Sequence, residues 1–143
     1  MALTPAQKND VLAALDQYAL AYQKKDREKI LSLASRGISG FGSGPDEIVT
    51  DSARLREQVS RDLMQADAIT ITFSPIRIAG QMPFAWITAL CCFQVTVSGE
   101  PVRLDGCITV LFRNTGNRWL IEQIHFSLPK IGQESGQSYK GCV

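Results

Sequence analysis

Residues 102–129 read VRLDGCITVLFRNTGNRWLIEQIHFSLP, and this stretch decides the fold class. Residues 102–113 and 119–127 are rich in β-branched, aliphatic and aromatic side chains, and the polar turn 114–117 separates them. Pro129 closes the second run. Because both runs are long and their connection is short, they predict an antiparallel hairpin at the end of the folded chain.

Further strands are predicted upstream of this hairpin. Residues 84–97 form a run that is apolar on both faces, and the turn 98–101 leads from it into the hairpin. From Ile69 onward apolar and polar residues alternate, but the phase changes at Pro75. A phase change of this kind predicts a bulge or bend. Residues 38–45, with glycine at every second position from 40 to 44, suggest a short strand whose bare face admits a close neighbour.

Three helices are predicted in the first half of the chain. Thr4 and Pro5 favour a helix start, and an apolar stripe that includes Tyr18 and Tyr22 follows at helical spacing. A second helix is expected from Asp26 to Gly37, and a third from Thr50 or Asp51. Helices that come first and strands that come last indicate an α+β fold.

Composition narrows the classes of function. The 143 residues are 45% hydrophobic and 20% charged, with a net charge of +1, which gives no electrostatic basis for binding nucleic acid. No apolar run is long enough to cross a membrane, and the first residues do not resemble a signal peptide, so we expect a cytoplasmic protein. The four cysteines and single histidine lack metal-ligand spacing, so no metal or cofactor is predicted.

Three segments resemble the nuclear transport factor 2-like superfamily, in its SnoaL-like and ketosteroid-isomerase-like branch: Gly42-Ser43-Gly44-Pro45-Asp46-Glu47, Phe84-Ala85-Trp86-Ile87, and Trp119 with His125-Phe126-Ser127. The resemblance implies a cystatin-like, cone-shaped and curved antiparallel sheet wrapped around the N-terminal helices. It implies one SnoaL-like domain over residues 1–129, while residues 130–143 are polar and contain glycine, which predicts a flexible tail. Members of the family include isomerases, cyclases, epoxide hydrolases, dehydratases and noncatalytic modules, and many of them dimerise across the sheet.

The last three predicted strands also favour a homodimer. If their turns hold four residues each, cross-strand pairing sorts the side chains onto two faces. Neither face is plainly polar, whereas a sheet covered on one side only should expose a polar face. A second copy packed on the sheet by two-fold symmetry would cover the remaining apolar area.

Glu122 is the sharpest candidate for chemistry. It lies between Leu120 and Ile124, and a carboxylate among apolar groups can act as a general acid or base. The alternative is a solvated glutamate or one paired with an arginine. The side chains expected to line the pocket with it come from the first helix and the strands: Tyr18, Tyr22, Trp86, Cys107, Thr109 and Phe126.

Other polar residues are weaker candidates. His125 lies three residues after Glu122, so strict alternation puts the two on opposite faces, and we expect His125 in the core or a dimer contact. Asp46 and Glu47 follow the glycine-rich segment near the expected pocket mouth, but solvated loop charges fit them equally well. Asp105 beside Cys107 is a further possibility, with an exposed carboxylate as its alternative.

Two functions remain open from the sequence. The first is a cofactor-free isomerase, cyclase or dehydratase-type enzyme that binds a small apolar or amphipathic molecule and uses acid/base chemistry. The second is a noncatalytic ligand-binding or homodimerisation module. The fold alone cannot choose between them, because this architecture serves both.

Overall fold

The computed structural model describes residues 2–141, and its elements follow the predicted order of helices before strands. The elements are α1 (Pro5–Gln23), α2 (Arg27–Ser32), β1 (Ala34–Phe41), β2 (Ile48–Val49), α3 (Ser52–Gln65), β3 (Ala68–Gln81), β4 (Phe84–Val97), β5 (Glu100–Asn114) and β6 (Trp119–Ser127).

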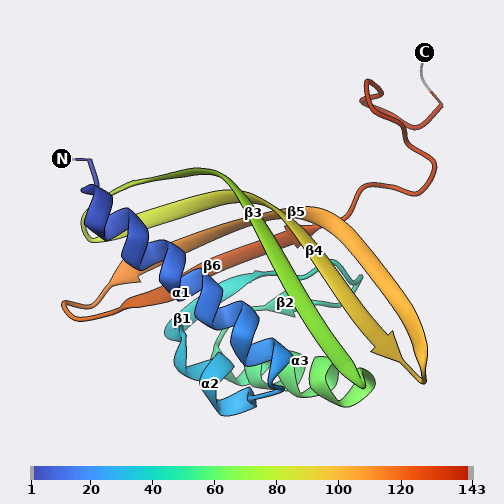
Figure 1. Ribbon diagram of the computed structural model, residues 1–143, viewed down its shortest axis with the longest axis horizontal. Helices are drawn as coiled ribbons and strands as arrows, with labels where there is room; N and C mark the ends of the chain where they lie inside the picture. The colour runs from blue at the N-terminus through green and yellow to red at the C-terminus, as the bar shows by residue number, and fades with distance from the viewer. Residues whose placement is uncertain (1, 142–143) are drawn as a thin grey trace.

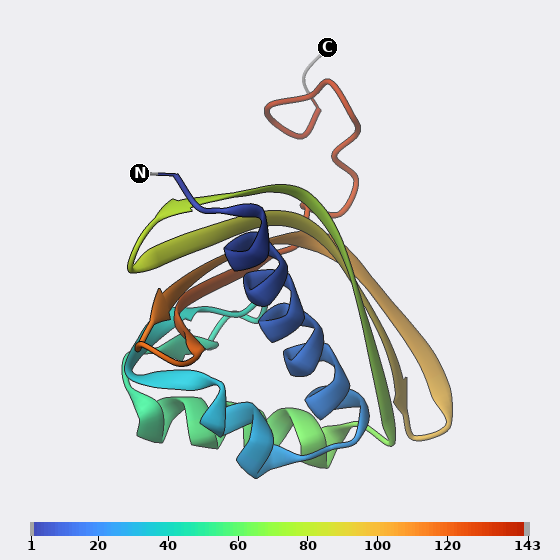
Figure 2. The ribbon, with the colours of Figure 1, turned by 60° about the vertical axis from the view of Figure 1, so that its left-hand side comes forward.

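The strands form one curved sheet in the order β2-β1-β6-β5-β4-β3. Neighbouring strands are antiparallel except β1 and β6, which run parallel. Figures 1 and 2 show α1 lying along the concave side of the sheet, while α2 and α3 close one end of the cone. This arrangement confirms the predicted α+β fold with a curved sheet wrapped around helices, although the parallel pair was not expected.

Helix α1 forms where the sequence predicts it and carries one side of the core. Thr4 caps it, because its side chain accepts from the backbone of Gln7 while the Gln7 side chain accepts from the backbone of Thr4. Val11 and Leu15 are fully buried and pack with the concave face of the sheet, which includes Ile87. The apolar stripe therefore fixes α1 inside the cone.

Two bulges break the alternation along the strands. In β3, the register against β4 shifts at Ile76, between Pro75 and Arg77, where the phase change predicts it. In β6, Ile121 pairs with Phe112 and Gln123 pairs with Leu111, so Glu122 has no partner in the ladder. This second bulge was not predicted, and it turns Ile124 and Phe126 to the same concave face as Ile121.

Helix α2 ends earlier than the sequence predicts. Its last residue is Ser32 rather than a residue near Gly37, and Gly37 lies inside β1. The reason is a tertiary contact. The backbone N–H of Ile121 donates to the carbonyl of Leu33, so the chain pairs with β6 directly after the helix. A side chain at Gly40 would collide with the backbone carbonyl of Ile124, so only glycine lets β1 approach β6 this closely.

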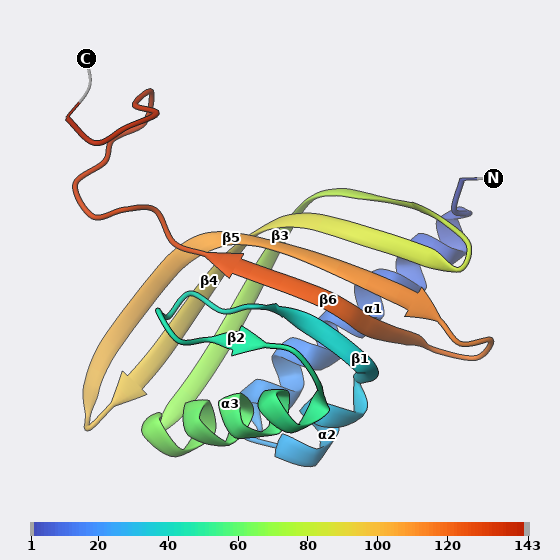
Figure 3. The same cartoon turned by 180° about the vertical axis from the view of Figure 1, so that it is seen from behind.

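After β6 the chain leaves the body of the molecule, as Figures 1 and 3 show. Residues 130–141 contain turns but neither helix nor strand, and the side chains of Ile131 and Tyr139 are exposed. The division into a domain over 1–129 and a flexible tail stays a prediction. Cys142 lies outside the described residues. No helix within residues 2–141 combines the length and the apolar character that a bilayer-spanning helix needs.

Candidate functional site

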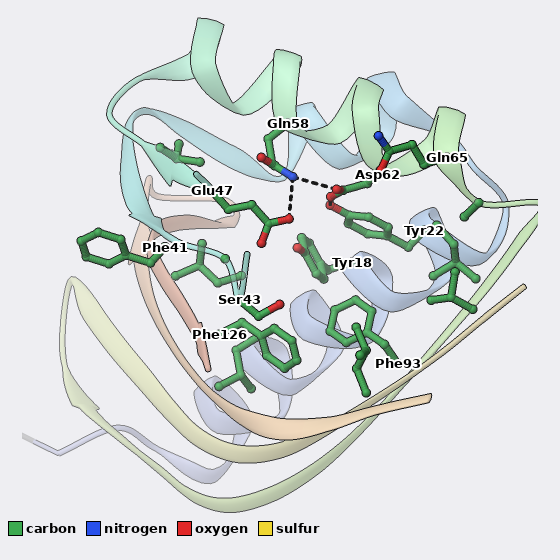
Figure 4. A pocket seen from close by; sticks show the side chains of 18 of the residues that line it. Tyr18, Tyr22, Phe41, Ser43, Glu47, Gln58, Asp62, Gln65, Phe93 and Phe126 are labelled. Atoms are coloured by element: carbon green, nitrogen blue, oxygen red, sulfur yellow. Dashed lines mark hydrogen bonds between the residues drawn. The ribbon is translucent and has the colours of Figure 1, made fainter. Parts of the chain in front are cut away.

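A cavity of about 300 Å³ lies between the concave face of the sheet, helices α1 and α3, and the loop that joins β1 to β2. Figure 4 shows side chains from all of these elements converging on it. Its sheet side is apolar throughout and includes Ile69, Phe93, Val95, Val97, Val102, Leu104, Ile108, Ile124 and Phe126. An apolar wall with a few polar groups at one end is typical of a small-molecule site.

The polar end of the cavity is built around Asp62 on α3. The Gln58 side-chain amide donates to Oδ1 of Asp62 at 2.7 Å and to Oε1 of Glu47 at 2.9 Å, so one nitrogen links two carboxylates. The Tyr22 hydroxyl donates to Oδ2 of Asp62 at 3.4 Å. Figure 4 shows these side chains together with Tyr18 around the same space.

Local helix geometry explains this convergence. Gln58 and Asp62 lie four residues apart on α3, so both face the cavity one turn from each other. Asp51 caps the helix by accepting from the backbone N–H of Arg54 at 2.9 Å. Tyr18 and Tyr22 are likewise four residues apart on α1, and their ring centroids lie 5.0 Å apart.

The glycine-rich loop makes room for the Glu47 carboxylate. Glu47 accepts a short hydrogen bond from the backbone N–H of Gly44 in addition to the bond from Gln58. A Cβ atom at Gly42 or Gly44 would lie 2.9 Å from carbon atoms of the Glu47 side chain. These glycines therefore permit the loop to fold around this carboxylate.

Arg61 occupies the outer side of this cluster. Its guanidinium donates to both carboxylate oxygens of Asp46, at 2.7 and 3.0 Å, and to the side-chain carbonyl of Gln58 at 3.1 Å. It also lies 3.7 Å from Oε1 of Glu47. The bidentate bond lowers the pKa of Asp46, so Asp46 stays ionised and holds Arg61 at the rim.

Burial controls the protonation of the groups inside. The pKa of Asp62 is raised to about 6: burial and, to a smaller extent, the Glu47 carboxylate raise it, while the hydrogen bond from Gln58 lowers it. Burial also raises the pKa of Tyr18 and of Tyr22, so both hydroxyls stay protonated. Asp62 can therefore exchange a proton near neutral pH beside two neutral donors, which is what general acid/base chemistry requires.

The predicted pocket residues divide between the two faces of the sheet. Tyr18, Tyr22 and Phe126 line the cavity. Trp86, Cys107 and Thr109 do not line it, because they lie on the outer, convex face. The prediction chose the wrong face of β4 and β5, since the buried residues of these strands, such as Ile87, are those that face the helices.

Glu122 also lies away from the cavity, so the structure does not support it as the acid/base group there. As the bulge residue of β6, it forms an ion pair with Arg113 on the outer face, with Nε and Oε1 3.2 Å apart. His125 lies on this outer face too, with its ring centroid 5.3 Å from that of Phe41. The prediction that Glu122 and His125 take opposite faces was wrong, because the bulge changes the alternation between them.

The remaining candidates are explained by their surroundings. Asp105 is exposed and pairs with Arg103 at 2.8 Å, as its alternative interpretation held. Cys91 is buried, and burial raises the pKa of its thiol to about 12, whereas Cys107 is exposed on the outer face. Within residues 2–141, no cluster of three or more histidine, cysteine, aspartate or glutamate side chains is placed to hold a metal ion.

Sequence reasoning missed Asp62 and Gln58, although one signal for Asp62 was present. Asp62 lies seven residues after Leu55 and three after Val59, and this spacing puts it on the apolar side of α3. A carboxylate at such a position indicates either a buried partner or a site. Nothing in the sequence alone connects Gln58 to Glu47.

Comparison with known proteins agrees with this architecture. A family model described as a SnoaL-like domain matches residues 11–131. None of the curated proteins matches the chain with significance.

Solved structures resemble the chain over most of its length. A dehydratase candidate of the nuclear transport factor 2-like family from Streptomyces avermitilis has a TM-score of 0.81 and 17% identity, covering 88% of this chain and 99% of its own. A nuclear transport factor 2-like superfamily protein from Salmonella enterica has a TM-score of 0.77 and 16% identity, covering 92% and 96%.

A third structure comes from Nostoc punctiforme and is described as a cystatin-like fold of unknown function, with a TM-score of 0.74 and 16% identity, covering 92% and 97%. At these identities the likeness shows the fold alone. The family match over residues 11–131 identifies the chain as a member of the SnoaL-like domain family, and its fold is that of the nuclear transport factor 2-like structures.

Proposed function

We propose that the chain binds a small amphipathic molecule in the cavity and transfers protons on it without a cofactor, with Asp62 as the acid/base group. One observation carries the proposal: Asp62 lies at the polar end of an apolar cavity, and burial raises its pKa to about 6. Proton transfer is most efficient when the pKa of the catalytic group lies near the working pH.

The surrounding residues supply the other requirements of such a reaction. As a base, the Asp62 carboxylate would remove a proton from a carbon next to a carbonyl or similar electron-withdrawing group. The Tyr18 hydroxyl, kept neutral by burial, would donate to the negative charge that develops on oxygen. The apolar wall formed by residues such as Phe93 and Phe126 would keep water away. Isomerisation and dehydration both consist of steps of this kind.

The proposal is tested with 5-nitrobenzisoxazole, a neutral probe for a base in an apolar site. Removal of its ring C–H proton breaks the N–O bond and releases a coloured phenolate, so no cofactor is needed. We expect the wild-type chain to accelerate this reaction with a rate that rises through about pH 6, where Asp62 loses its proton. Asp62→Asn should lower kcat/KM by about 100-fold.

Two matched variants serve as controls for this experiment. Asp16→Asn makes the same chemical change at an exposed position of α1, and Glu122→Gln removes the carboxylate of the outer face. Both should keep the wild-type rate and pH profile. A rate that survives in Asp62→Asn, or that falls only in Glu122→Gln, would contradict the assignment of Asp62.

A homodimer through the outer face of the sheet is a second proposal, and it does not depend on catalysis. It is supported by the exposed side chains of Trp86 and Leu90, which lie four residues apart on the convex face of β4. Leu90→Arg should produce a monomer if a second copy covers this face, and Leu20→Arg on the exposed side of α1 is the control. A wild-type chain that sediments as a monomer at micromolar concentration would contradict the dimer.

A further inference from the structure

The charge of the cavity lining has one sign. Among the lining residues, all of which belong to the described part of the chain, Glu47 and Asp62 are acidic and none is lysine, arginine or histidine. The other polar groups of the lining are neutral hydroxyls and amides, as in Tyr18 and Gln65. A ligand in this cavity therefore meets negative charge that no lining side chain neutralises.

Two cations beside the cavity have partners of their own. Arg61 is held by two hydrogen bonds to Asp46 and lies 3.7 Å from Glu47. The Lys25 ammonium donates to the backbone carbonyl of Ala66 at 2.6 Å. Two positive groups against the three carboxylates Asp46, Glu47 and Asp62 leave a net charge of −1 when all are ionised.

The two carboxylates also keep free capacity to accept hydrogen bonds. Each carboxylate has about four acceptor sites. The contacts described for Asp62 come from Gln58 and Tyr22, and the hydrogen bonds described for Glu47 come from Gln58 and Gly44. An ammonium group carries three donors, so it can use the acceptor sites that remain.

Aromatic rings border the same space as the carboxylates. The tilted rings of Tyr18 and Tyr22 lie 5.0 Å apart on the helix side, and those of Phe93 and Phe126 lie 4.8 Å apart on the sheet side. Both tyrosines remain neutral because burial raises their pKa. The face of such a ring attracts a cation, and carboxylates beside aromatic faces are the groups that recognise an ammonium ion.

We propose that this cavity selects a cationic amphipathic ligand, a protonated amine whose ammonium group lies between Glu47 and Asp62 and whose hydrocarbon or aryl part packs against the sheet. The inference rests on the binding part of the proposed function and makes no use of its catalytic step. A ligand of the same shape with a carboxylate would be repelled, and an alcohol would gain hydrogen bonds but no ionic attraction.

The test compares three probes with the same phenylbutyl group: 4-phenylbutylamine, 4-phenylbutanol and 4-phenylbutyrate. Each is titrated into the full chain by calorimetry at about pH 7.5, where Asp62 is ionised. We expect the amine to bind at least about 10-fold more tightly than the alcohol, and the carboxylate to bind least.

Matched variants locate the effect. Glu47→Gln should remove most of the preference for the amine over the alcohol, and Glu57→Gln on the exposed side of α3 should leave both affinities unchanged. Leu104→Trp, which fills the cavity from the sheet side, should weaken all three probes. If Leu104→Trp does not weaken the binding of the probes, they bind elsewhere and the proposal is overturned.

The acidity of Asp62 gives a second readout. Affinity for the amine should rise between about pH 5 and 7.5 as Asp62 loses its proton, whereas affinity for the alcohol should not rise. The groups that face Asp62 are Tyr22 and Tyr18 from α1, Gln58 and Arg61 from α3, and Glu47 from the loop. Both tyrosines stay neutral, and Arg61 stays charged, throughout this range.

The outcomes separate this inference from the function on which it rests. If the alcohol or the carboxylate binds as tightly as the amine, the cationic preference is overturned while binding in the cavity stands. If none of the probes binds, both are overturned. If the amine preference persists in Glu47→Gln and does not change with pH, the ammonium site between the carboxylates is overturned.

Discussion

Asp62 and Glu122 are both carboxylates at positions of an apolar sequence pattern, yet the two sides of one sheet give them different surroundings. Asp62 lies on the concave side, where burial raises its pKa and the hydroxyl of Tyr22 reaches it. Glu122 lies at a bulge on the convex side, paired with Arg113. Apolar neighbours in the sequence therefore do not identify a functional carboxylate. A functional carboxylate is identified by the side of the sheet toward which its side chain points.

The largest difference between the faces should appear in stability. Ile87 is fully buried on the concave face and Leu90, an isomeric side chain on the same strand, is 51% exposed on the convex face. Ile87→Ala should lower the free energy of unfolding by about 3 kcal/mol, and Leu90→Ala by about 0.5 kcal/mol or less. Urea denaturation measures both. A large loss for Leu90→Ala that depends on protein concentration would mean that a partner covers the convex face.

The two carboxylates should respond to amide substitution with opposite signs. Because the pKa of Asp62 is raised in the folded state, its ionisation costs stability; this cost builds up between about pH 4, the ordinary pKa of an aspartate, and about pH 6, and it is complete above that. Asp62→Asn should therefore stabilise the chain by about 2 kcal/mol near pH 8 and by almost nothing near pH 4. Glu122→Gln should destabilise it by about 0.5 kcal/mol, since it loses a partly exposed ion pair.

Thermal or urea unfolding at both pH values measures these signs, with the exposed Asp16→Asn as the control. If Asp62→Asn destabilises the chain equally at both pH values, Asp62 is an ordinary hydrogen-bonded residue and the contrast with Glu122 disappears.

A smaller effect is expected in the loop that holds Glu47. Gly42→Ala places a methyl group against the Glu47 side chain, which must then move away from Gln58. We expect a loss of about 1 kcal/mol. Gly37→Ala is the matched control, because nothing lies near its added methyl group. Equal stabilities of the two variants, measured by urea unfolding, would show that Glu47 is not held as described.

The smallest effect concerns the hydrogen bond that the Tyr22 hydroxyl donates to Asp62. Tyr22→Phe removes a hydrogen bond that lowers the pKa of Asp62, so this pKa should rise further above 6. The free energy of unfolding should fall by about 0.5–1 kcal/mol. An NMR titration of Asp62 in this variant measures the change, and Tyr139→Phe in the exposed tail is the control. An unchanged pKa would remove Tyr22 from the site.

Local patterns in the sequence predict much of the fold. The helix caps at Thr4, Asp26 and Asp51 and the bulge near Pro75 lie where local chemistry predicts them. Local patterns determine these features because the partners are near neighbours in the chain. The early end of α2 could not be read in this way, because it depends on pairing with β6, about ninety residues later.

The site was only partly predictable for the same reason. Tyr18 and Tyr22 follow from the stripe of α1, since any inward residue of a central helix borders the interior. The bulge at Glu122 could not be seen in the sequence as a change in the alternation of apolar and polar residues. Leu120, Ile121 and Ile124 are all apolar, although they do not all lie on one face. The cluster of Glu47, Gln58 and Asp62 joins a loop to a helix through side chains, and only the folded structure shows that contact.

The most direct test of the account is the pKa of Asp62 itself, measured by NMR titration of its side-chain carboxyl carbon in the full chain. We predict a midpoint near 6, and a lower midpoint for Asp62 in the Glu47→Gln variant, because the Glu47 carboxylate contributes to the raised pKa. A midpoint at or below about 4, the ordinary value for an aspartate, would contradict the assignment of Asp62 as the acid/base group of the cavity.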